Sequence, residues 1–143
     1  MKYTLLILAI LGIIVSSLAL REHYRTYGDA PCDINAHWDC GVVNHSPYAM
    51  FYGVPVAAIG IGGYLLLGLL ALRRAYSWML PFVIIALLFA VHLADIEDYV
   101  LGVWCLYCVI SLGIISLMTL LNLGTVIVLQ NPWVLIKGRK SGP

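Results

Sequence analysis

One stretch decides the fold of this chain: residues 103–129, VWCLYCVISLGIISLMTLLNLGTVIVL, which contain no charged side chain. A helix needs about 20 apolar residues to cross the hydrocarbon core of a bilayer, because each residue rises only about 1.5 Å and the backbone polar groups must be satisfied within the helix. The stretch is long enough to cross a membrane and also to tilt or protrude. A Cys-x-x-Cys motif stands at its start, where chemistry would meet the membrane surface.

Three further apolar stretches have the length of a membrane span: residues 3–20, 54–72 and 78–93, the last with room to continue to about Leu101. The 143-residue chain is 62% hydrophobic and 10% charged, with a mean hydropathy of +0.96. A soluble domain carries about a quarter charged residues, so an ordinary soluble fold is excluded. The net charge of +1 excludes the basic surplus of a nucleic-acid binder. The prediction is an all-α integral membrane protein, a bundle of four transmembrane helices.

The charged residues sort almost completely to the two sides of such a bundle. One side holds six of the eight cations and no acid: Lys2, Arg73, Arg74, Lys137, Arg139 and Lys140. The other side holds two arginines and all seven acids: Arg21, Arg25, Glu22, Asp29, Asp33, Asp39, Asp95, Glu97 and Asp98. The positive-inside rule then places both termini in the cytoplasm.

This orientation predicts a multi-pass protein of the cell inner (cytoplasmic) membrane, in contact with membrane lipid. Residues 1–130 form the membrane domain and residues 131–143 a cytoplasmic tail. A secretory signal is the alternative for the first segment, because Ser17-Leu18-Ala19 offers small residues of the kind that signal peptidases cleave after. The apolar run is long for a signal, which favours a retained span.

All four cysteines lie on the predicted extracytoplasmic side. Cys32 and Cys40 belong to the long polar segment 21–52 between the first two spans, and Cys105 and Cys108 open the fourth span. Loops of that length are usually functional. The outer side of a bacterial-type membrane is an oxidising compartment, so two cysteine pairs there indicate redox work.

The spacing of Cys105 and Cys108 places both sulfurs on one face of a helix. In the first turns of that helix, unpaired amides and the macrodipole favour a thiolate, as a thiol exchange centre requires. Cys108 lies about 4.5 Å deeper than Cys105, at about 1.5 Å per residue, and so closer to the lipid.

Haem attachment and metal binding fit the polar and cysteine clusters less well. Val109 follows the motif where haem attachment requires a histidine. A zinc site is disfavoured because seven residues separate Cys32 from Cys40, where a zinc ligand pair has two to four. The cluster His92, Asp95, Glu97 and Asp98 is interpreted as a polar helix end at the membrane surface, so no metal is predicted. The loop pair taken alone also fits a structural disulfide.

Two cysteine pairs on one side favour an electron relay. Electrons would enter at the exposed pair, pass by disulfide exchange to the buried pair, and leave to an acceptor in the membrane. The chain has no haem, flavin or iron-sulfur motif, so a lipid-soluble quinone is the predicted two-electron acceptor. Small residues near the second span would let a flat ring approach the backbone, although ordinary helix packing explains each one singly as well: Gly53, Ala57, Ala58, Gly60, Gly62 and Gly63.

From Met1 to about Gln130 the chain resembles the membrane core of the vitamin K epoxide reductase family, bacterial branch. The motifs that carry the resemblance are Cys32 and Cys40 with Ser46 beyond them, Phe51-Tyr52-Gly53-Val54-Pro55 with Tyr64, and Trp104-Cys105-Leu106-Tyr107-Cys108 with Ser111. The other bacterial family that links quinones to disulfides has its two kinds of cysteine pair in the reverse order.

The resemblance implies a four-helix bundle that holds a quinone of the ubiquinone or menaquinone type near its outer end. Cys108 would face the quinone, Cys105 would exchange with Cys40, and Cys32 would take electrons from a partner. The residues expected to bind the quinone are Ser46, Phe51, Gly53, Cys108 and Ser111.

Bacterial members of this family often carry a fused thioredoxin-like domain, and none fits after Gln130, so a separate periplasmic thioredoxin-like partner is expected. Ala49 and Leu112 stand where vertebrate-type members have Asn and Tyr, which speaks against epoxide reduction. The predicted function is a quinone-dependent thiol-disulfide oxidoreductase that generates disulfides. The alternatives are a quinone or vitamin K epoxide reductase that uses a small thiol, and a non-enzymatic membrane protein with structural disulfides.

Overall fold

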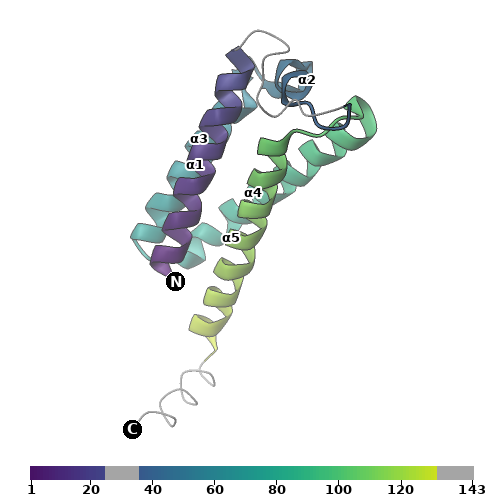
Figure 1. The fold of residues 1–143 in the computed structure, drawn as a ribbon. Helices are drawn as coiled ribbons and strands as arrows, with labels where there is room; N and C mark the ends of the chain where they lie inside the picture. The colour runs from purple at the N-terminus through teal and green to yellow at the C-terminus, as the bar shows by residue number, and fades with distance from the viewer. Residues whose placement is uncertain (25–35, 132–143) are drawn as a thin grey trace.

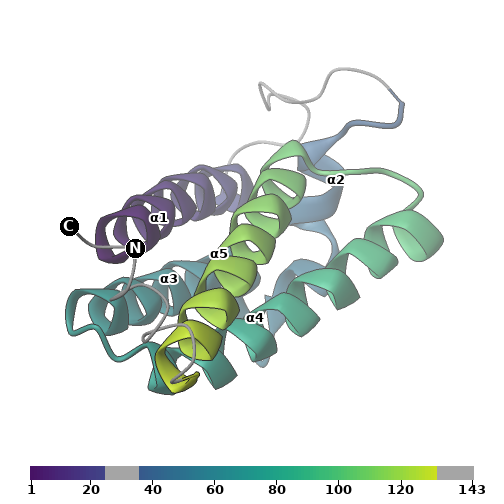
Figure 2. The same ribbon diagram turned by 90° about the horizontal axis from the view of Figure 1, so that it is seen from below.

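Four long helices lie side by side in the computed structural model, which describes residues 1–24 and 36–131 (Figures 1 and 2). They are α1 (Lys2–Tyr24), α3 (Val56–Leu72), α4 (Tyr76–Ile96) and α5 (Leu106–Gln130). α1 packs against α3 and α5, and α4 packs against α5 and α3. The predicted all-helical fold is confirmed in these ranges, while Cys32 lies outside the described residues.

The helices expose apolar side chains that water would not tolerate. Ile7, Leu65, Leu88 and Leu120 are among many large hydrophobic residues on the outer surface, and apolar surface of this extent marks contact with lipid or protein. Three helical segments are long and apolar enough to cross a membrane: α1, α5 and the continuous segment Tyr76–Leu101. The chain is a multi-pass membrane protein. α3 has 17 residues and is shorter than these three, so the count of four spans stays a prediction.

Small residues let α1 and α3 approach closely. A Cβ atom added at Gly12 would overlap the ring of Tyr64, and one added at Gly60 would lie 2.9 Å from the Ser16 hydroxyl oxygen. The glycines of the second span therefore serve helix packing in part, and Gly12 seats a buried tyrosine.

Gly12→Ala is expected to destabilise the protein by about 1–3 kcal/mol, the usual cost of overpacking a close-packed interface. Gly62→Ala is the matched control, because a Cβ atom there has open space and alanine has the higher helix propensity. Thermal unfolding in detergent measures both variants. Equal unfolding temperatures for the two variants would contradict the close contact of Gly12 with Tyr64.

The end of the bundle that carries the cysteines is capped by short elements between α1 and α3: α2 (Cys40–His45), the 3₁₀ turn η1 (Pro47–Ala49), and the hairpin of β1 (Met50–Phe51) and β2 (Val54–Pro55). Tyr52 and Gly53 form the hairpin turn with φ of 50° and 81°. Positive φ at both central residues is typical of the tight turns that match strand twist. Gly53 is explained by this turn.

The connection from α4 to α5 brings Cys105 to the same end. α4 continues as a π-helical turn, η2 (Glu97–Leu101), which confirms the predicted extension to Leu101. Gly102 ends the turn in the left-handed region, with φ of 67°. Cys105 is extended and caps α5, so the last helix begins three residues later than the predicted residue 103. The start of α1 and the end of α5 both lie at the opposite end of the bundle (Figure 1).

Candidate active site

Backbone pairing joins the two cysteine-bearing segments. The Asp39 amide donates to the Trp104 carbonyl at 3.0 Å, and the Trp104 amide donates to the His37 carbonyl at 2.7 Å. Asp39 and Trp104 each stand immediately before a cysteine, so the pairing fixes Cys40 and Cys105 as neighbours. No movement of α2 is needed to bring Cys40 to the inner pair.

Local hydrogen bonds hold α2 in this position. The Asp39 carboxylate accepts from the Val42 amide at 2.9 Å, which caps the helix start. The buried side chain of Asn44 donates to the Cys40 carbonyl at 2.9 Å and to the Cys105 Sγ at 3.6 Å. In the sequence Asn44 reads as a turn-former. The structure instead makes it a donor to the sulfur of the inner pair.

The sulfur atoms of Cys40 and Cys105 lie 3.4 Å apart, and both residues are fully buried. Cys40 is disulfide-bonded, whereas Cys105 and Cys108 are free thiols. Reacting atoms that are held about 3–3.5 Å apart are already in a near-attack geometry. The geometry presents a thiol to one sulfur of a disulfide, which is the arrangement that disulfide exchange requires.

The Cys105 thiol lies just before the membrane-spanning helix α5, and its surroundings favour the thiolate form. A hydrogen bond from the Cys108 thiol lowers the pKa of Cys105, and the amides of Cys108 and Tyr107 act in the same direction. Burial and the negative charge of Glu97 oppose this, but the net pKa remains below the ordinary value. Cys105 therefore carries a thiolate at a lower pH than an ordinary thiol and is the better leaving group of an exchange reaction.

Cys108→Ala is expected to raise the pKa of Cys105, because the variant lacks the thiol that stabilises the thiolate. The measurement is a pH titration of thiolate ultraviolet absorbance in a background where Cys32 and Cys40 are serine. The thiolate signal should appear at a higher pH in the variant than in its parent. A transition at the same pH would show that Cys108 does not stabilise the Cys105 thiolate.

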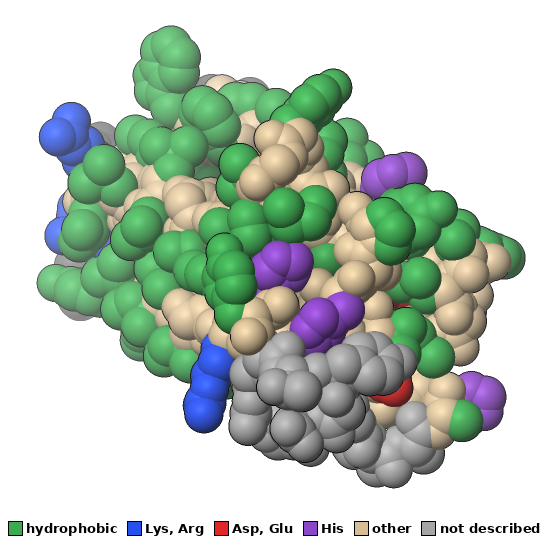
Figure 3. Space-filling model, turned by 90° about the horizontal axis from the view of Figure 1, so that it is seen from above, with side chains coloured by type: hydrophobic (Ala, Val, Ile, Leu, Met, Phe, Trp, Pro, Cys, Tyr) green, Lys and Arg blue, Asp and Glu red, His purple; other side chains and the backbone are tan. Residues whose placement is uncertain are grey.

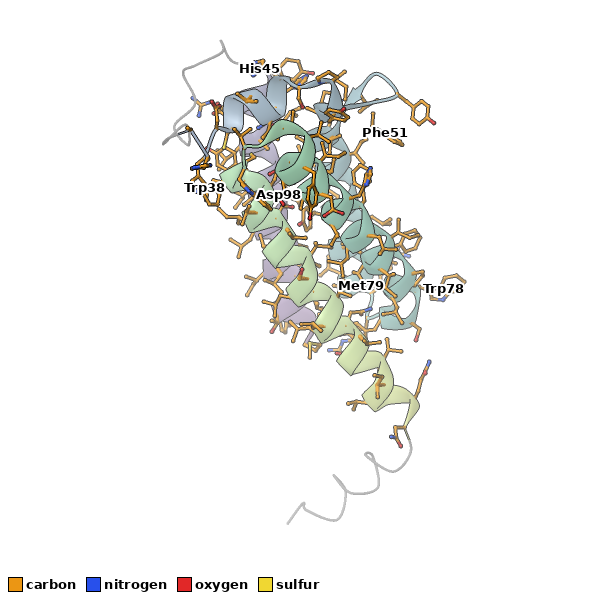
Figure 4. All side chains as sticks on the ribbon, turned by 90° about the vertical axis from the view of Figure 1, so that its right-hand side faces the viewer. Trp38, His45, Phe51, Trp78, Met79 and Asp98 are labelled. Carbon is orange, nitrogen blue, oxygen red and sulfur yellow. The ribbon has the colours of Figure 1, made fainter. Side chains whose placement is uncertain are left out.

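A cavity of about 460 Å³ opens among the helices beside Cys108, with contributions from η1 and the hairpin. Its walls are mostly apolar, and its volume lies in the usual range for small-molecule sites. Of the predicted quinone residues, four line it: Ser46, Phe51, Cys108 and Ser111. Gly53 lies in the hairpin turn and is not among the lining residues. Figure 4 shows Phe51 at this end of the bundle, far from Trp78.

Few polar groups face this cavity, and some of their hydroxyl protons are already donated to other groups of the protein. The Ser46 hydroxyl donates to the Val43 carbonyl at 2.7 Å, so it offers only lone pairs to a ligand. The Tyr64 hydroxyl lies 3.0 Å from the Ser111 carbonyl and 2.8 Å from the Ser111 hydroxyl. When Tyr64 donates to the Ser111 hydroxyl oxygen, the Ser111 hydroxyl keeps its own proton for a ligand in the cavity. A flat, apolar ring with carbonyl oxygens fits these walls and this donor.

Glu97 belongs to the site, although the sequence predicts only a polar helix end at this position. Its side chain is 2% exposed, while Asp95 and Asp98 are exposed; Figure 4 labels Asp98. One carboxylate oxygen accepts from the Cys105 amide at 3.0 Å, and the carboxyl also hydrogen-bonds to the Cys108 thiol. Three acids in four positions resemble a solvated helix end, and residue type does not distinguish Glu97 from its neighbours.

Within the described ranges, no three His, Cys, Asp or Glu side chains converge as a metal site requires. His45, which follows the loop cysteine, contacts the Gly41 carbonyl at 2.7 Å, and its ring stacks on that of His23 at 6.4 Å. Figure 3 looks down on this end, where hydrophobic side chains dominate and histidines gather near the centre of the face. These contacts account for His45 as a packing residue.

A family model described as the vitamin K epoxide reductase family matches residues 3–123. The chain belongs to the vitamin K epoxide reductase family. The match covers the four long helices except Lys2 of α1 and the end of α5, and it includes every cysteine. The vitamin K epoxide reductase family comprises membrane oxidoreductases, so the protein is a membrane oxidoreductase.

Proposed function

We propose that the protein oxidises a separate periplasmic thioredoxin-like partner and passes the electrons to a quinone of the ubiquinone or menaquinone type, thereby generating disulfides. One observation carries the proposal: the two sulfurs of the Cys-x-x-Cys motif have different neighbours. Cys105 meets Cys40 at 3.4 Å, whereas Cys108 lines the apolar cavity. Neither Cys40 nor Cys105 is among the residues that line the cavity.

The proposed relay consists of two disulfide exchanges. The Cys40 thiolate attacks the Cys105 sulfur of an oxidised inner pair, and the Cys105–Cys108 bond breaks. The Cys32 thiolate then attacks Cys40, which forms the outer disulfide and releases Cys105 as a thiolate. The lowered pKa of Cys105 favours this second step, because a thiol of lower pKa leaves faster. Support for this order comes from the oxidised state of Cys40 beside free thiols at Cys105 and Cys108.

The proposed placement is the inner membrane, with four spans and both termini in the cytoplasm. α3 has 17 residues, at the short end of what crosses a bilayer. The start of α1, which carries Lys2, and the turn between α3 and α4, which carries Arg73 and Arg74, lie at the end of the bundle opposite α2 (Figure 1), and this suits a cytoplasmic face by the positive-inside rule. The cysteines would then face the periplasm, and residues 131–143 would form the cytoplasmic tail.

The test is a turnover assay with purified protein, a reduced thioredoxin-like donor and a short-chain quinone. Quinone reduction should match donor oxidation one to one and should require both components. A protein with two structural disulfides would instead keep the inner pair oxidised and leave the quinone untouched. Absence of quinone reduction with any reduced thioredoxin-like donor would overturn the proposal.

A further inference from the structure

We propose that Glu97 accepts the proton of the Cys108 thiol when the Cys105–Cys108 pair is oxidised, and passes it into the cavity. This inference rests on the proposed function for its oxidant, the quinone. Glu97 lines the same cavity as Cys108. Glu97 has a buried carboxyl that contacts the backbone of Cys105 but is not a partner in the exchange between Cys40 and Cys105.

The Glu97 carboxyl contacts both halves of the inner pair. It accepts the backbone N–H of Cys105 at 3.0 Å and hydrogen-bonds to the Cys108 thiol. The bond from the Cys105 amide holds the carboxyl in place, and the amide proton does not titrate. The second bond involves the single Cys108 S–H proton, which the carboxyl shares with the Cys105 sulfur, and Cys108 is the one cysteine that lines the cavity among the described residues. A general base has to lie close to the proton that it takes, and Glu97 is the one carboxyl among the described residues that line the cavity with Cys108.

The surroundings of Glu97 favour a change of protonation state. It is 2% exposed, and no lysine, arginine or histidine pairs with it among the described residues. A buried carboxylate without a cation is stabilised only by its hydrogen-bond donors. Oxidation removes the Cys108 S–H donor, and the proton that leaves with it neutralises the carboxylate. The carboxyl also opens a π turn, a feature that frequently occurs at functional sites.

The oxidation step balances as follows. The S–S bond between Cys105 and Cys108 forms, and the Cys108 S–H bond breaks. The two sulfurs give two electrons to the quinone, and the Cys108 proton goes to Glu97 and then to a quinone oxygen. The second proton of the quinol comes from water at the outer surface, where Cys105 released its own proton on becoming a thiolate.

The first test needs no quinone. Quinone-free protein is oxidised with a water-soluble disulfide, and the redox-difference infrared spectrum is recorded. A protonated-carboxyl band should appear in the native protein and in Asp98→Asn, whose exposed acid is the matched control, and should be missing in Glu97→Gln. A native spectrum without this band would overturn the inference even if Glu97→Gln failed to fold.

The second test is turnover. Glu97→Gln keeps the size of the side chain and an oxygen for the Cys105 amide, but it cannot take a proton. Its kcat with quinone should fall by about 10²–10⁴-fold, the usual contribution of general base catalysis. Glu97→Asp should recover part of this loss, and Asp98→Asn should match the native protein. Native turnover in Glu97→Gln would overturn the inference, whereas inactivity of the native protein would overturn the proposed function and leave the infrared result to decide on Glu97.

Discussion

Replacing Cys108 by alanine is expected to abolish quinone reduction. Cys108 is the sulfur that lines the cavity, and without it the inner pair cannot form a disulfide. Electrons that reach Cys105 from Cys40 then have no route to an acceptor in the membrane. The measurement is the rate of quinone reduction with saturating reduced donor, which should drop to the uncatalysed rate.

Ser116→Ala is the matched control for this variant. Ser116 lies on the same helix, its hydroxyl donates to the Leu112 carbonyl within that helix, and it does not line the cavity. Its turnover should equal that of the native protein. Full turnover in Cys108→Ala would mean that quinone takes electrons from another sulfur and would refute the assignment of Cys108.

Replacing Cys32 by serine is expected to trap a disulfide between Cys40 and Cys105. In this variant Cys40 can still attack the inner pair, but the second exchange has no thiol to complete it. The 3.4 Å separation of the two sulfurs directs the attack to Cys105. Mass spectrometry of non-reduced digests should find the Cys40–Cys105 link as the dominant species.

Cys105→Ser provides the counterpart, because it should leave Cys32 and Cys40 paired with each other. The two variants together separate the exchange partner from the cavity-facing cysteine. A dominant Cys40–Cys108 link in the Cys32→Ser protein would mean that the roles of the two inner cysteines are reversed. The orientation of the motif in the helix would then not determine the order of the relay.

The helices could be predicted because long apolar runs permit little else in a membrane. Their ends were less accurate, since Cys105 is extended and α5 starts at Leu106. That difference matters for the site, because a cap residue points its side chain away from the helix face that residue spacing predicts. Spacing alone therefore places Cys105 and Cys108 in one environment, whereas the structure gives them two.

Two features of the site have no local signature. Glu97 is buried while Asp95 and Asp98 are exposed, although all three are acids at the same helix end. The contact of Cys40 with Cys105 depends on backbone pairing around Trp104, between segments that no periodicity connects. The family resemblance implies that Cys40 exchanges with Cys105. Only the structure shows the backbone hydrogen bonds that hold these two cysteines together.

The pairing around Trp104 also orders the events of folding. Cys40 and Cys105 are 65 residues apart in the chain, and closing a loop of that length has an entropic cost that only the later contacts can offset. During synthesis Cys40 emerges before α3, α4 and Cys105, so the outer cysteines are available for oxidation while the inner pair does not yet exist. If the protein generates disulfides as proposed, each new copy depends on a late long-range contact before it can begin its own catalytic cycle.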